Sequence, residues 1–168
     1  MRILKLRRFI VFSGLCFVLA ACSENPRTAA YTHKYKLDKS DRIASIYWSD
    51  GDSGRITLKD GTIIKFRLND IDAPETGGVG AAIGGAKCEK ERELGYLAKE
   101  WAVEYTRDVP VTITADHGED RHGRNIFDLA ANDNDIGQAG IEAGVYGSWE
   151  HDGSRSLEPR PEWCKNGN

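Results

Sequence analysis

Turn-forming residues divide the region before Pro74 into three short apolar segments, each of a length that suits a strand. Residues 42–48 are rich in Ile, Tyr and Trp, and a polar run of Ser, Asp and Gly follows them. Residues 55–58 and 63–71 form the next two segments, and the Asp-Gly pair between them is a strong hairpin signal. The third strand must stop near Pro74, because proline lacks a backbone donor and favours an extended residue before it. The sequence therefore predicts a three-stranded meander.

A glycine-rich loop and a segment with helical periodicity, 90–107, come next. Apolar side chains recur there at helical spacing, at Leu94, Leu97, Ala98, Trp101 and Tyr105. Residues 109–115 and 126–131 have the pattern of two more strands. Asp135, with a glutamine three residues later, resembles a capping box that opens a helix ending near Gly144. This order predicts a mainly β fold with α-helices, namely a five-stranded OB-fold barrel with two or three helices.

Residues 1–21 have the pattern of a signal peptide. A basic head precedes an apolar run at 9–21, which is shorter than the roughly 20 residues that a membrane span needs. The run ends in Leu-Ala-Ala before Cys22, and this resembles the lipobox of bacterial lipoproteins, whose cysteine is acylated and becomes the first residue. An ordinary small-residue cleavage site and a retained single-span anchor are the alternatives.

This N-terminus predicts an exported monomer of the cell envelope, anchored by lipid to a membrane and facing the periplasm or the outside, with no obligate protein partner. Residues 23–40 have no apolar period and suit a flexible tether. A single domain is expected at 41–147, followed by an irregular tail at 148–168.

The cysteines support the same organisation. Cys16 leaves with the signal peptide and Cys22 carries lipid, so Cys88 and Cys164 are the two thiols that remain. Thiols in an oxidising compartment usually pair. The sequence therefore predicts a disulfide between Cys88 and Cys164 that ties down the tail.

The net charge limits how this chain can meet nucleic acid. The full chain carries a formal net charge of -3, and loss of the basic signal peptide makes the mature chain more acidic. Long-range attraction to phosphate normally comes from patches of Lys and Arg. Any contact with nucleic acid must therefore depend on a local cationic site.

Three motifs carry functional information. They are Asp50-Gly51-Asp52-Ser53, then Arg67-Leu68 with Ile71-Asp72-Ala73-Pro74-Glu75-Thr76, and then Asp120-x-x-Gly123-Arg124. In this order, and with similar separations, they resemble the thermonuclease (micrococcal-nuclease-like) family over residues 40–145. The resemblance implies an OB-fold enzyme that uses one calcium ion to cut DNA and RNA with little sequence preference.

The resemblance also implies a set of metal ligands. By similarity, Asp52 and Asp72 bind the ion through their carboxylates, and the backbone carbonyl of Ala73 helps. Calcium prefers such oxygen ligands and keeps water in its remaining positions. Two anions at one point are costly unless a cation lies between them.

Catalytic roles follow from the same similarity. Glu75 is expected to orient or deprotonate the attacking water, and Arg67 and Arg124 to clamp the phosphate. A guanidinium suits this role because its planar fork donates two hydrogen bonds and stays charged at any working pH. Strand alternation puts Arg67 and Asp72 on opposite faces, so a shared site predicts a bend or bulge between them.

The chain departs from the family at two places. His122 stands where a tyrosine is usual before the Gly-Arg pair. The region after Gly144 does not align with the family's aromatic nucleotide pocket. Tyr146 and Trp149 are therefore candidates for that pocket and, equally, for ordinary packing residues.

Two other functions remain open. A non-catalytic OB-fold lipoprotein that binds nucleic acid or another ligand is favoured by the acidic charge and disfavoured by the intact set of functional residues. A ββα-metal nuclease, with magnesium and His122 as the base, is suggested by the run 120–123. That run resembles the Asp-Arg-Gly-His box of some non-specific endonucleases with its last two residues exchanged.

Overall fold

The computed structural model describes residues 43–152 and 155–165. All of the described residues belong to one structural unit. The predicted signal peptide, the acylation site Cys22 and the tether at 23–40 lie outside the described residues. Within the described ranges, no helix has both the length and the apolar character that a membrane crossing requires.

The first three strands form the predicted meander. They are β1 (Ile43–Trp48), β2 (Ser53–Leu58) and β3 (Ile63–Leu68), and each pairs antiparallel with the next. The hairpin between β2 and β3 turns at Gly61, whose φ of +88° lies in the left-handed region that glycine tolerates. Its turn is fixed by the Thr62 amide, which donates to Asp60 Oδ1 at 2.7 Å. The Asp-Gly signal therefore has the predicted role.

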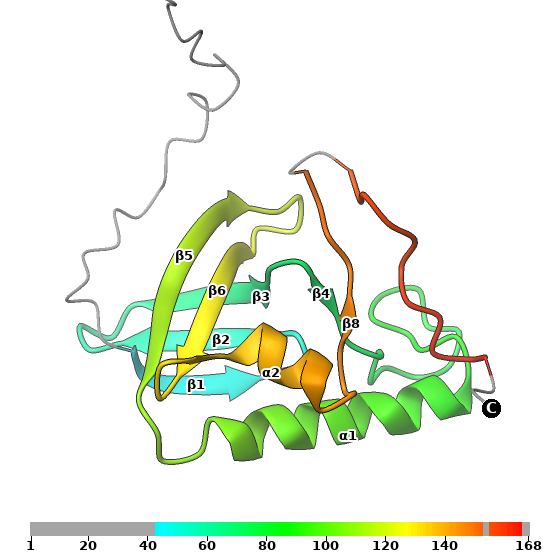
Figure 1. The fold of residues 1–168 in the computed structure, drawn as a ribbon, viewed down its shortest axis with the longest axis horizontal. Coiled ribbons are helices and arrows are strands. Elements are labelled where there is room, and N and C mark those ends of the chain that lie inside the picture. Colours follow the sequence, from blue (N-terminus) through cyan, green and yellow to red (C-terminus); the bar gives the residue numbers. More distant parts are fainter. Residues whose placement is uncertain (1–42, 153–154, 166–168) are drawn as a thin grey trace, which may run out of the picture. The chain divides into compact units, whose positions relative to one another are not determined.

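A second group of strands extends this sheet. β5 (Val111–Glu119), β6 (Asn125–Ala131) and the short β7 (Asn134–Asp135) are antiparallel neighbours, while β6 runs parallel to β3. The path is β1-β2-β3-β6-β5, and β7 adds to β6 (Figure 1). The mainly β fold with two helices is therefore confirmed, as a mixed sheet of six strands. It is not closed into the five-stranded barrel of the sequence prediction, because β1 and β5 contact each other without pairing.

The strand predicted at 63–71 is broken in two. β3 ends at Leu68, and β4 (Ile71–Asp72) pairs antiparallel with β8 (Gly147–Ser148) in a separate two-stranded sheet. Asp70 makes the break with a φ of +50°, a left-handed conformation that aspartate adopts more readily than most residues. This is the bend that a shared site for Arg67 and Asp72 requires.

Two helices flank the sheets. α1 (Glu89–Tyr105) matches the helix predicted at 90–107, although it begins and ends slightly earlier in the chain. α2 (Ile136–Glu142) begins at the predicted N-cap, where Asp135 Oδ1 accepts from the Gln138 amide at 2.7 Å. The capping box is incomplete, because the Gln138 side chain donates to Glu142 and does not contact the backbone amide of Asp135.

The buried face of α1 agrees with the predicted one only in part, at Ala98, with Trp101 and Tyr105 partly buried beside it. It consists of Glu91, Gly95, Ala98 and Ala102, whereas Leu97 is 57% exposed. The reason is a close approach of backbone. A Cβ added to Gly95 would lie 2.5 Å from the Glu75 carbonyl oxygen, and one added to Gly51 would lie 2.8 Å from the Ala98 Cβ. Small residues on α1 therefore let the segments that carry the predicted functional residues pack directly on the helix.

The core fills the space between the sheet and the helices. Its largest fully buried apolar side chains are Ile56, Phe66, Phe127, Leu129 and Ile136. Burying each side chain of this size contributes about 1.5–3 kcal/mol. Tyr146 belongs to the same core: only 3% of it is exposed, its ring covers Gly140, and its hydroxyl donates to the Gly51 carbonyl at 2.5 Å. Tyr146 is thus a packing residue that also holds the loop before Asp52.

Candidate functional site

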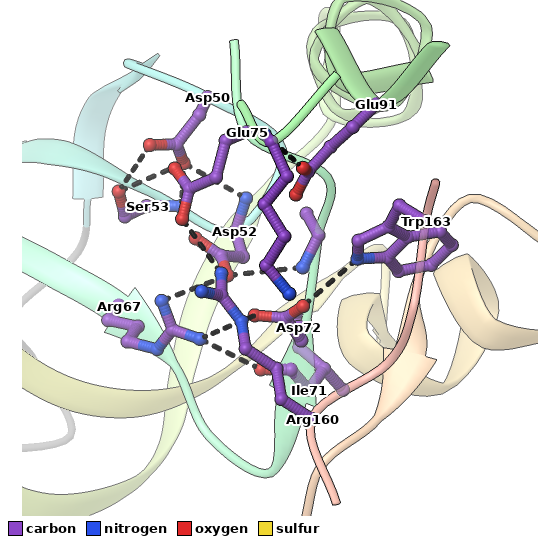
Figure 2. Close-up of polar contacts among 12 residues, drawn as sticks. Asp50, Asp52, Ser53, Arg67, Ile71, Asp72, Glu75, Glu91, Arg160 and Trp163 are labelled. Carbon is purple, nitrogen blue, oxygen red and sulfur yellow. Dashed lines mark hydrogen bonds and ion pairs between the residues drawn. The ribbon is translucent and has the colours of Figure 1, made fainter. Parts of the chain in front are cut away.

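Five charged side chains from distant parts of the chain meet beside β4 (Figure 2). We call them the charged cluster, and its members are Asp52, Arg67, Asp72, Glu75 and Arg160. The first four were predicted from the sequence, whereas Arg160 was not. Loops, strands and the C-terminal segment all contribute to the cluster, so only the folded chain assembles it.

A tight turn presents Asp52. The Asp50 carboxylate accepts from the Ser53 amide at 2.8 Å, from the Ser53 hydroxyl at 2.9 Å and from the Asp52 amide at 3.2 Å. Such side-chain bonds to the following amides are typical of aspartate turns. The turn leaves Asp52 Oδ2 to accept from the backbone amide of Ala73 at 3.2 Å. The loop between β1 and β2 is therefore joined directly to the segment after β4.

Arg67 connects the two predicted metal ligands. Its Nη1 lies 3.0 Å from Asp52 Oδ2, and its Nη2 lies 3.5 Å from Asp72 Oδ1. Nη2 also donates to the carbonyl of Ile71 at 3.2 Å. Only 16% of the Arg67 side chain is exposed, so these contacts are poorly screened by water. A single guanidinium thus neutralises two carboxylates that face a common point.

Arg160 takes the other side of the cluster. Its Nε lies 2.8 Å from Asp72 Oδ1, and its Nη2 lies 2.7 Å from Glu75 Oε1. Trp163 completes the set, because its Nε1 donates to Asp72 Oδ2 at 3.0 Å. Both oxygens of the fully buried Asp72 therefore receive donors from the C-terminal segment. Glu75 is joined to the other members through Arg160.

Sequence reasoning missed Arg160 and Trp163 because no regular element predicts their position. One signal was present: Arg160 stands between Pro159 and Pro161, four residues before Cys164. Prolines fix the φ angle and reduce the freedom of the chain between them. A charged residue in such a restrained and covalently tied segment is a stronger candidate for a defined contact than one in a free tail.

Trp149 lies against both arginines. The centre of its ring system is 5.6 Å from the guanidinium carbon of Arg67 and 5.5 Å from that of Arg160. These are cation–π distances.

The backbone of Trp149 is also fixed. Its amide donates to the Asp70 carbonyl at 2.9 Å, which ties this residue to the bend before β4. Its own Nε1 is buried and has no hydrogen-bond partner among the described residues. Trp149, unlike Tyr146, therefore belongs to the site.

Burial and mutual repulsion shape the titration of the acidic residues. Burial raises the pKa of Asp72, and the nearby charge of Asp52 adds to this effect, while donors from Trp163 and Arg160 oppose it. Burial, followed by repulsion from Asp52, raises the pKa of Asp50 to about 7. Burial lowers the pKa of Arg160, but its contacts with Glu75 and Asp72 outweigh this effect and hold the pKa above its ordinary value. The site thus carries more negative charge than it easily accommodates.

Arg124 lies outside the charged cluster. Its Nε and Nη2 both lie 2.8 Å from Asp120 Oδ2, and its backbone amide donates to Asp120 Oδ1 at 3.0 Å. Among the described residues, no hydrogen bond or ion pair joins Arg124 to Asp52, Asp72 or Glu75. It nevertheless precedes Asn125, which pairs with Phe66 beside Arg67. The predicted second phosphate clamp is therefore engaged within its own turn.

His122 lies in the same turn and is exposed. Its Nε2 lies 3.1 Å from Arg121 Nε, and its amide donates to Asp120 Oδ1. This arrangement neither joins His122 to the charged cluster nor gives it a second metal-ligating side chain.

The predicted disulfide between Cys88 and Cys164 is confirmed, with a Cα–Cα distance of 6.0 Å. Cys88 is the N-cap of α1, where its sulfur accepts from the Glu91 amide. The bridge therefore fixes the C-terminal segment to the start of the helix on which the Glu75 segment packs.

The donor chemistry of the cluster suits a hard divalent cation. Asp52 and Asp72 present carboxylate oxygens beside the backbone of Ala73, and oxygen is the ligand that calcium selects. Within the part of the chain that the structure describes, no group of three or more His, Cys, Asp or Glu side chains is arranged to hold a metal ion. A cation here would have the carboxylates of Asp52 and Asp72 as its side-chain ligands, and it would compete for them with Arg67 and Arg160.

Comparisons with known proteins leave the chain without an assigned family. No protein-family model matches the sequence, and no curated protein is significantly similar to it.

Proposed function

We propose that the charged cluster is the active site of a calcium-dependent nuclease, which hydrolyses phosphodiester bonds of DNA, RNA or both with little sequence preference. The observation that carries this proposal is the bridge from Arg67 to both Asp52 and Asp72, at 3.0 and 3.5 Å. A buried pair of carboxylates with a guanidinium beside it provides both ligands for a cation and a donor for phosphate.

Each residue has a distinct role in this proposal. Asp52 and Asp72 hold the cation, together with the carbonyl of Ala73. A bound calcium ion supplies Lewis acidity to the phosphate oxygens. Arg67 donates to the phosphate and stabilises the charge that develops in the pentavalent transition state. Glu75 orients the attacking water or accepts its proton.

Arg124 is proposed as the second phosphate clamp. The carboxylate of Asp120 holds Nε and Nη2, which form one two-donor edge of this guanidinium. A phosphate dianion or diester can replace a carboxylate as the partner of a guanidinium, because both accept two parallel hydrogen bonds. Substrate binding would then exchange one anion for another at Arg124.

The same proposal covers the architecture and the location of the chain. The strand path β1-β2-β3-β6-β5, whose end strands approach each other, supports an opened variant of the five-stranded OB-fold barrel. The disulfide supports residence in an oxidising compartment, as expected for an exported, lipid-anchored protein of the cell envelope. Nucleic acid is the proposed substrate, and the chain is proposed to act as a monomer.

A digestion assay tests the proposal. Plasmid DNA and RNA are incubated with the protein in calcium, in magnesium or in chelator, and the fragments are followed by electrophoresis. We expect calcium-dependent cleavage, and we expect Glu75→Gln to reduce the rate by about 10²–10⁴-fold because it removes a general base. Glu93→Gln, on the exposed face of α1, is the matched control and should keep full activity. Failure to cut either nucleic acid in calcium would exclude the nuclease.

A non-catalytic binding protein is the second candidate. It is favoured by the complete internal satisfaction of Asp72, whose two oxygens already accept from Arg160 and Trp163. If these contacts of Asp72 need no ligand, their role is structural: they hold the C-terminal segment in place. Gel-shift binding of nucleic acid without turnover, unchanged by chelator, would select this candidate.

A further inference from the structure

Arg160 contacts the two carboxylates that the proposed nuclease needs most. Its Nε lies 2.8 Å from Asp72 Oδ1, and its Nη2 lies 2.7 Å from Glu75 Oε1. With Trp163 on the other oxygen of Asp72, the segment 158–164, which we call the strap, covers a predicted metal ligand and the predicted catalytic carboxylate. While these contacts last, Asp72 cannot use the same lone pairs for a cation, and Glu75 is held away from the role of base.

We propose that Arg160 is an internal competitor for the divalent cation, which closes the site at low calcium and must swing out for the ion to bind. This inference rests on the proposed function, since it concerns how the same site is regulated. Two buried carboxylates need positive charge beside them. Arg67 supplies one such charge, and Arg160 supplies the second through its contact with Asp72. In this proposal a bound cation takes the place of Arg160 while Arg67 stays.

Exposure identifies Arg160 as the member that can leave. Its side chain is 35% exposed, compared with 16% for Arg67 and 0% for Asp72. Arg67 lies on β3, which is paired on both sides, by β2 and by β6. Arg160 lies on no strand or helix. Rotation about its side-chain bonds would carry the guanidinium into water without moving any element of the sheet.

The backbone of the strap, in contrast, is held in several places. Cys164 is bonded to Cys88, and the Ser148 hydroxyl and the Glu150 amide both donate to the Glu158 carboxylate, at 2.7 and 3.0 Å. A Cβ added to Gly147 would lie 2.5 Å from Pro161, so the strap packs closely on β8. Because the backbone stays in place, the guanidinium remains near Asp72 after it leaves, at the high effective concentration of an intramolecular partner.

Calcium binding, measured by titration calorimetry on chelator-treated protein, tests this inference without relying on turnover. The apparent affinity of a ligand falls by the fraction of protein that is competent to bind it. If Arg160 closes the site in all but about 1–10% of the molecules, Arg160→Gln should bind calcium about 10- to 100-fold more tightly than the wild type. Arg155→Gln is the matched control, because Arg155 lies just before the strap, its side chain is 79% exposed and its ion pair is with Asp152, outside the charged cluster. It should bind calcium as the wild type does.

A second variant guards against misfolding of the first. Trp163→Phe keeps the apolar ring and removes the donor to Asp72, so it should also tighten calcium binding, by a smaller factor. If Arg160→Gln fails to fold, calcium binding by Trp163→Phe tests the inference in its place. Unchanged or weaker binding in the folded variant overturns the inference, as does the absence of calcium binding by every variant.

The digestion assay separates the two proposals. Tighter calcium binding by Arg160→Gln, without cleavage by any variant, supports the internal competitor and excludes the nuclease. Cleavage by the wild type, with no gain of affinity in Arg160→Gln or Trp163→Phe, supports the nuclease and overturns the internal competitor.

Discussion

At the scale of single residues, the chemistry of this protein depends on how Asp52, Asp72 and Glu75 share Arg67 and Arg160. Asp72 is fully buried, and Asp52 is nearly so. Removing one partner of a buried pair costs more than the pair contributes, because the remaining charge stays desolvated. Each arginine of the site is therefore expected to have a structural role as well as any catalytic one.

Asp50 gives a pH dependence that stability measurements can detect. Its pKa is raised to about 7 in the folded chain, from an ordinary value of 3.8, so folding favours the protonated form. This stabilisation is complete below about pH 4 and is lost as the pH rises through 7, up to an upper bound of about 4 kcal/mol. We expect Asp50→Asn, which keeps the Oδ1 acceptor, to flatten the fall in unfolding free energy between pH 4 and 8.

Urea denaturation in chelator at several pH values measures this effect. Asp133→Asn, on an exposed turn, is the control and should follow the wild-type pH profile. Parallel pH profiles for Asp50→Asn and the wild type would contradict the assignment of this shift to Asp50.

At the scale of elements, α1 positions the site through small residues instead of large ones. Periodicity predicted the existence of the helix and most of its length. It identified the buried face only in part: Ala98 is buried and Trp101 and Tyr105 pack against the core, but Leu97 is exposed and Gly95 and Ala102 were not selected because they are small. The small residues of α1 are buried because Gly51 lies close to Ala98, and the backbone of residues 74–75 lies close to Gly95. Hydrophobic spacing cannot predict such a contact, since it depends on how loops distant in sequence pack on the helix.

Gly95→Ala tests this close contact. In an exposed helix interior, such a change usually stabilises by about 1 kcal/mol. Here the new Cβ would lie 2.5 Å from the Glu75 carbonyl oxygen and 2.8 Å from that of Pro74, so backbone must move. We expect a loss of stability of about 1–3 kcal/mol, together with a lower cleavage rate because Glu75 is displaced. Thermal denaturation and the digestion assay measure the two effects.

A control on the same helix separates propensity from packing. Glu93→Ala changes an exposed position of α1 and should leave both the melting temperature and the rate nearly unaltered. A Gly95→Ala variant that is as stable and active as the wild type would show that the contact is not needed.

At the scale of the whole molecule, the structure brings residues of the first two motifs together, but it leaves Arg124 of the third motif outside the cluster and adds Arg160. The motif order brought Asp52, Arg67 and Asp72 together correctly, and the required bend at Asp70 is present. The sheet order departs from a closed barrel because β1 and β5 do not pair. Arg160 was unpredictable from local pattern, because its partners lie 85 and 88 residues earlier in the chain.

The disulfide should contribute strongly to global stability. It closes a loop with a sequence separation of 76 residues. Replacing both cysteines by serine is expected to lower the unfolding free energy by about 2–4 kcal/mol, mainly by freeing the unfolded chain. Urea denaturation of Cys88→Ser/Cys164→Ser, compared with the wild type before and after reduction, measures this loss. Equal midpoints for the oxidised wild type and the double variant would contradict it.

The pairing of β4 with β8 has a consequence for the order in which this molecule can form. Asp72 lies opposite Gly147 and takes its remaining donors from positions 160 and 163. A growing polypeptide therefore holds the acidic residues and Arg67 long before it holds Arg160 and Trp163, which complete their contacts. Contacts of such large sequence separation form late, since loop closure must be achieved first. The site is completed only after residues 160–164 have been synthesised, so a nascent chain that stops before them cannot assemble it.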